Sequence, residues 1–133
     1  MNNNRFGVGP GPFAVAFMIV AQLSLSSARA DIPAGPNVVN VISSDFSFDM
    51  PDSLPAGPTL FHHINNGEQL HHVTLVKLEQ GKTLSDFTAL PPGPFPSWAV
   101  LVGGPNTPTP QQGHVDDIVD LAPGNYVAIC VIP

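Results

Sequence analysis

Cysteine is almost absent from this chain, because Cys130 is the only one among 133 residues. A single thiol excludes an internal disulfide. Cys130 lies in the apolar run from Tyr126 to Ile132, which follows the turn signal Pro123-Gly124, so we expect it in a buried strand. A cysteine in such a strand is either a small buried hydrophobe or a thiolate ligand for a metal, and this stretch alone leaves both open.

Positive charge is scarce as well, with four Lys and Arg residues against ten Asp and Glu residues. Both arginines precede residue 31, and the rest of the chain keeps only Lys77 and Lys82 as cations. Because an acidic surface repels phosphate groups, we expect neither nucleic acid nor an anionic membrane as a partner. A basic protein, in particular a redox protein, stays open as a partner.

The patterns of familiar enzymes are missing too. The sequence has no Ser-His-Asp order, no nucleophile elbow and no zinc motif. Its adjacent carboxylates, Asp116 and Asp117, would point to opposite faces of a strand and could not act as a pair. We therefore do not expect an enzyme.

No apolar run is long enough to cross a bilayer comfortably, which takes about 20 residues. The run over residues 13–25 is interrupted by Gln22 and Ser24, with Arg5 before it and Ala28-Arg29-Ala30 after it. A weakly positive start, a short apolar run and a small-residue end are typical of a signal peptide.

We therefore expect residues 1–30 to be a signal peptide that is cleaved after Ala30. The remaining domain would span residues 31–133 and would lie in the periplasm or outside the cell, with no membrane insertion after cleavage. A chain of this size can form one domain with a modest core.

Short apolar segments separated by Pro- and Gly-rich turns predict an all-β antiparallel sandwich. In the segment 115–121, we expect Val115, Ile118 and Leu121 to turn inward. The expected strands cover residues 38–48, with a bend at Ser43-Ser44, and residues 59–64, 71–78, 99–102, 115–121 and 126–132.

One short helix is expected to begin at Thr83, whose side chain can cap the first turn while Asp86 favours its positive end. Pro91-Pro92 would end the helix after about two turns. We expect it to act as a plug over one end of the sandwich.

The histidines are the strongest candidates for a functional role. His71 shares its strand parity with the apolar Val73 and Leu75, so it should point inward at the mouth of the sandwich, where a metal ligand belongs. His72 points the other way on this parity and is the alternative ligand. The others are expected at the edge, on the surface or in a loop, namely His62, His63 and His114.

Two segments together resemble the blue-copper, or cupredoxin, family. In that family a histidine opens a strand after an Asn/Gly-rich turn, and a Gly-x-Tyr-x-x-x-Cys strand brings the thiolate alongside it. Gly124, Tyr126 and Cys130 match the second pattern, and the resemblance covers residues 36–133. The segments are Asn65-Asn66-Gly67-Glu68-Gln69-Leu70-His71-His72-Val73 and Leu121-Ala122-Pro123-Gly124-Asn125-Tyr126-Val127-Ala128-Ile129-Cys130.

The resemblance implies an eight-stranded Greek-key sandwich, copper as cofactor and one-electron transfer, with His71 and Cys130 as the matching ligands. Thiolate and imidazole together suit copper in both oxidation states. The family's second histidine and axial methionine follow the cysteine, whereas only residues 131–133 follow it here, and neither His114 nor Met50 replaces them by pattern. We therefore expect a truncated chain or fragment that lacks the last strand and cannot make a blue copper site by itself.

Two other functions stay open beside the copper electron carrier. One is a metal-free β-sandwich that serves as a binding or structural module, with Cys130 simply buried. The other is a copper chaperone, which would use the two His-His pairs.

Overall fold

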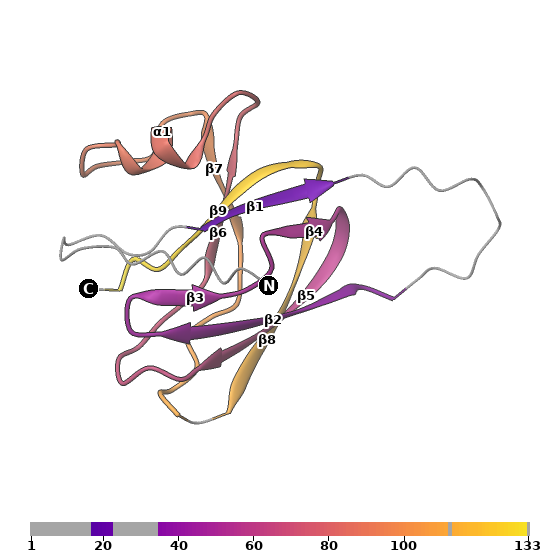
Figure 1. Ribbon diagram of the computed structural model, residues 1–133, viewed down its shortest axis with the longest axis vertical. Coiled ribbons are helices and arrows are strands. Elements are labelled where there is room, and N and C mark those ends of the chain that lie inside the picture. Colours follow the sequence, from indigo (N-terminus) through magenta and orange to yellow (C-terminus); the bar gives the residue numbers. More distant parts are fainter. Residues whose placement is uncertain (1–16, 23–34, 112, 133) are drawn as a thin grey trace, which may run out of the picture.

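The computed structural model describes residues 17–22, 35–111 and 113–132, with the backbone alone for residues 17–22. These residues form two β-sheets and one short helix, which confirms the all-β class (Figure 1). None of the helices in the described ranges is long and apolar enough to cross a membrane.

The first sheet has four strands in the order β3-β2-β5-β8. Strand β2 (Asn37–Ser44) runs parallel to β5 (Gly57–Asn65), and β8 (His114–Leu121) is antiparallel to β5. Strand β3 (Ser47–Asp49) folds back on β2 through a turn at Asp45-Phe46, where Phe46 has a φ of 63°.

The second sheet has five strands in the order β4-β1-β9-β6-β7. Its centre is β9 (Gly124–Ile129), which is antiparallel to both β1 (Phe17–Gln22) and β6 (Thr74–Leu78). Strand β4 (Ser53–Pro55) pairs with β1, and β7 (Ala99–Gly103) pairs with β6.

Apolar side chains from the two sheets meet in a shared core. Alternation along β9 sends Tyr126 and Ala128 into this core and Val127 and Ile129 to the opposite face of the sheet. The buried members of the core are Val39, Val41, Phe48, Leu54, Phe61, Val73, Leu75, Val119, Leu121, Tyr126, Ala128 and Cys130.

The helix α1 (Leu84–Thr88) packs through Phe87 against the outer face of the five-stranded sheet. Its start is as predicted, because Thr83 is the N-cap and forms a reciprocal capping box with Asp86. Phe87 packs under the helix in a cluster with Val127 and Ile129 of β9. The helix therefore lies on a sheet face, and the prediction that it plugs an end of the sandwich was wrong.

Two strand predictions also need correction. The segment 38–48 is a hairpin that reverses at Asp45-Phe46, because Phe46 adopts a left-handed conformation, and not one strand bent at Ser43-Ser44. Ile118 of β8 is 61% exposed, since the strand alternates strictly and turns Val119 and Leu121 inward in its place.

Strand β1 lies inside the apolar run of the predicted signal peptide. It hydrogen-bonds along the edge of β9 that faces away from β6. We expected the chain to lack the strand that follows Cys130 in cupredoxins; in the structure, β1 from an earlier part of the chain pairs along this side of β9. The rest of the segment 1–30 lies outside the described residues, so its cleavage stays a prediction.

Candidate metal centre

Cys130 and His71 meet at the end of β9. The Sγ of Cys130 lies 4.0 Å from the Nδ1 of His71, and the two residues are only 5% and 8% exposed. Strand parity predicted that His71, rather than His72, turns toward Cys130, and the structure has this arrangement. Metal binding by the pair stays a prediction.

The loop after β5 carries His71 to this position. Asn65 organises the loop, because its side-chain amide donates to the Gln69 carbonyl at 2.8 Å while its Oδ1 accepts the backbone N–H two residues on at 2.9 Å. Beyond His71, the N–H of Val73 donates to the carbonyl of Pro105 at 3.3 Å. The chain is thus held by hydrogen bonds on both sides of the histidine, although the predicted strand begins only at Thr74.

Asp45 lies behind the His71 ring and was not predicted as part of the site. Its Oδ1 accepts from His71 Nε2 at 3.0 Å and from the backbone N–H groups of Glu68 at 3.1 Å and Gln69 at 3.2 Å. These donors, the imidazole foremost, hold the pKa of Asp45 below its ordinary value of 3.8. The carboxylate is therefore ionised at neutral pH.

The contact with Asp45 determines which nitrogen of His71 carries a proton. An ionised carboxylate only accepts hydrogen bonds, so Nε2 must carry the proton. When the ring carries this one proton only, Nδ1 has the free lone pair, and Nδ1 is the atom directed at Cys130. A carboxylate behind an imidazole is also the arrangement that orients histidine ligands in metal sites.

The separation of the two donor atoms suits a shared ion. Bond lengths of about 2.3 Å from metal to sulfur and about 2.0 Å from metal to nitrogen add to roughly 4.3 Å. Atoms 4.0 Å apart can therefore hold one ion with an open angle at the metal. Binding would displace the thiol proton, because the ligand is the thiolate.

His63 is buried, although an edge or surface position was expected. Its Nδ1–H donates to the Asn106 carbonyl at 3.1 Å, and its Nε2 accepts from the Ser43 hydroxyl at 3.0 Å. Burial lowers the pKa of His63, so the ring stays neutral with both nitrogens occupied. It supports the interior and has no free nitrogen for a metal.

The remaining histidines lie away from the thiol. His72 is half-buried, and burial lowers its pKa. His114 is the first residue of β8 and not a loop residue as predicted, and it lies beside His62 on the outer face of the four-stranded sheet. Within the described residues, no third His, Cys, Asp or Glu ligand converges on His71 and Cys130.

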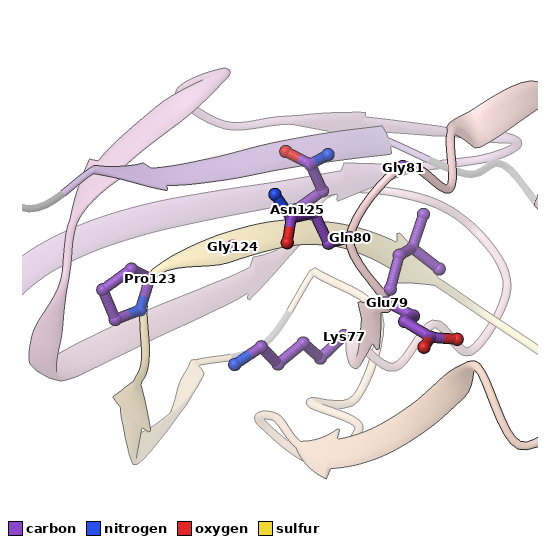
Figure 2. Close-up of a pocket in the computed structure, with 8 residues that line it drawn as sticks. Lys77, Glu79, Gln80, Gly81, Pro123, Gly124 and Asn125 are labelled. Atoms are coloured by element: carbon purple, nitrogen blue, oxygen red, sulfur yellow. The ribbon is translucent and has the colours of Figure 1, made fainter.

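A hollow of about 520 Å³ lies on the surface where β6 ends and β9 begins. The Lys77 amine and the Glu79 carboxylate point away from each other in this hollow (Figure 2). No imidazole or thiol lines it, so it does not contribute to a metal centre. The lining residues are Lys77, Leu78, Glu79, Gln80, Gly81, Pro123, Gly124 and Asn125.

No protein-family model matches this chain, and no curated protein matches it.

Proposed function

We propose that the chain is a copper-binding, cupredoxin-like β-sandwich in which His71 and Cys130 supply two ligands of an electron-transfer site. The observation that carries this proposal is the 4.0 Å approach of the Cys130 sulfur to Nδ1 of His71, the ring nitrogen on the side away from the contact with Asp45. The resemblance of the His71 turn and the Cys130 strand to the cupredoxin pattern supports it as well.

The chain's own residues would hold the site in a fixed geometry. Asp45 orients the His71 ring, and the burial of both donor atoms keeps water from competing for the ion. A rigid and dry site lowers the rearrangement needed between oxidation states, which favours fast electron transfer. Copper, when bound, would supply the one-electron chemistry.

Two donors do not complete a trigonal His₂Cys site. We therefore expect Cu²⁺ added to the full chain to give no intense visible thiolate-to-copper band until exogenous imidazole supplies a third strong ligand. The band should then be absent from Cys130→Ser and His71→Gln and present in the matched control His72→Gln. An imidazole-dependent band that survives Cys130→Ser, or no band under any condition, would refute the proposal.

The metal-free module is the second candidate function. It is favoured by the same geometry, because a buried thiol can donate to Nδ1 and leave the pair satisfied without an ion. In the described residues no buried side-chain nitrogen or oxygen lacks a hydrogen-bond partner. Absence of the thiolate-to-copper band from the wild-type chain, with and without imidazole, would decide for this candidate.

A copper chaperone is the least supported of the three functions. His63 and His71 turn inward while His62 lies on the outer face of its sheet, so the two His-His pairs do not form one surface site.

A further inference from the structure

We propose that His62, His114 and Asp116 form a second metal site, for a divalent transition-metal ion, on the outer face of the four-stranded sheet. This site is independent of the copper site proposed above. Its three ligand atoms all lie within 4.8 Å of one another. No other group of three His, Cys, Asp or Glu side chains in the described ranges is arranged this way.

The register of β5 and β8 brings the three side chains together. His62 lies directly across from Asp116, and Ile64 lies across from His114. His114 and Asp116 are two residues apart on one strand, so they point to the same face. That face is the outer one, because the alternate residues Phe61 and His63 of β5 are completely buried.

The distances show that the three groups already face one another. His62 Nδ1 lies 2.7 Å from Asp116 Oδ1, and His114 Nε2 lies 3.8 Å from Asp116 Oδ2. The two imidazole rings lie alongside each other, with centroids 4.1 Å apart and planes inclined by 37°. A carboxylate flanked by two imidazoles is therefore assembled on a sheet, which is a rigid support.

The chemistry of these donors selects a class of ion. Two imidazoles and one carboxylate suit Zn²⁺, Cu²⁺, Ni²⁺ or Co²⁺, whereas Mg²⁺ and Ca²⁺ prefer oxygen ligands. An ion bound between His62 and Asp116 would replace the proton that Nδ1 now donates to the carboxylate. The ring can carry a proton on Nε2 while Nδ1 binds the ion, because the two nitrogens are separate sites.

The site is open to solvent and therefore to exchange of the ion. The side chains of His62, Asp116 and His114 are 28%, 45% and 52% exposed. Water could fill the remaining coordination positions, as in metal sites with three protein ligands. The Asp116 carboxylate, whose two oxygens lie 2.7 Å and 3.8 Å from the two imidazoles, supplies an oxygen ligand beside the two nitrogen ligands.

The two proposed sites can be tested separately, because they share no residue. Zn²⁺ would be titrated by calorimetry into the full chain carrying Cys130→Ser, which removes the thiolate and leaves this cluster intact. We expect one Zn²⁺ to bind. His62→Gln, His114→Gln and Asp116→Asn, each added to that background, should weaken binding by more than about 10-fold, since even outer-shell changes commonly cost that much.

Matched controls come from the same chain. Asp120→Asn removes an exposed carboxylate from the same strand and face, and His72→Gln removes a half-buried histidine outside the cluster. Neither should change the Zn²⁺ affinity, and excess Mg²⁺ should not compete. The proposal would be overturned if the three cluster variants bind Zn²⁺ as tightly as these controls do, or if binding is weaker than about 1 mM.

Discussion

Gly67 packs directly against Asp45 and leaves no room for a side chain of its own. A Cβ atom on Gly67 would lie 2.9 Å from Nε2 of His71 and nearer still to the Asp45 carboxylate. Gly67 thus permits the close approach on which the contact between Asp45 and His71 depends.

We expect Gly67→Ala to lower the free energy of unfolding by about 1–3 kcal/mol, because the added methyl group must push apart the carboxylate and the imidazole. Gly35→Ala is the matched control, since a Cβ there meets nothing within 4 Å and should change stability by no more than about 0.5 kcal/mol. Denaturant unfolding measures both variants. Equal stabilities would contradict the described geometry of the loop.

Asp45→Asn should weaken copper binding by about 10- to 100-fold, because the variant loses the charged acceptor that keeps the proton on Nε2 of His71. Asp52→Asn, which changes an exposed carboxylate, should leave the affinity unchanged. Competition with a copper chelator gives the two affinities when both variants also carry His62→Gln, which removes a ligand of the proposed second site. Nitrogen NMR shifts of His71 would report whether its tautomer changes in Asp45→Asn. Equal affinities in the two variants would exclude a positioning role for Asp45.

Stability should fall with acid in two steps. Burial lowers the pKa of His63 and His72 below the ordinary value of 6.5. Below pH 6.5 the unfolded chain therefore binds more protons than the folded one, and the free energy of unfolding decreases as the pH falls. Hydrogen bonds lower the pKa of Asp45 and Asp86, so a further loss begins as the pH falls below their ordinary value of 3.8.

Denaturant unfolding measured at about pH 7.5, 5 and 3 checks both steps, because the expected free energy of unfolding decreases in that order. A double variant, Asp45→Asn with Asp86→Asn, should flatten the lower step and keep the upper one. A profile that stays level between pH 7.5 and 5 would contradict the burial of the neutral His63 ring.

The corrected register of β8 predicts opposite outcomes for two neighbouring residues. Val119→Ala should cost roughly 1–3 kcal/mol, because the side chain is 7% exposed and packs in the shared core. Ile118→Ala should stay within about 0.5 kcal/mol, since its side chain lies on the surface. Thermal unfolding of the two variants measures the difference. A larger loss of stability in Ile118→Ala than in Val119→Ala would mean that β8 turns its other face to the core.

Features set by neighbouring residues could be predicted from the sequence. The capping box of Thr83 and Asp86 is a local pattern, and the inward turn of His71 follows from the alternation of a few residues. The hairpin at Asp45-Phe46 was missed, because no Gly or Asn marks the residue with positive φ there.

Features set by contacts between distant strands could not be predicted. Asp45 reaches His71 across 26 residues of sequence, and His62 reaches Asp116 across 54. The spacing of His114 and Asp116, two apart in one strand, was the available signal for the second cluster. It could not identify His62 as the third member without the register of β5 against β8.

Residues 17–22 would be removed if they belong to a signal peptide, whereas the sheet retains them as strand β1. In the folded chain these residues separate β4 from β9 and pair with both. Among the described strands β4 pairs with β1 alone, so cleavage after Ala30 would detach β4 from the sheet and leave the amides and carbonyls along one side of β9 unpaired. An open edge of this kind accepts a strand from another molecule. If cleavage occurs before folding, we therefore expect this open edge to recruit a strand from a second molecule.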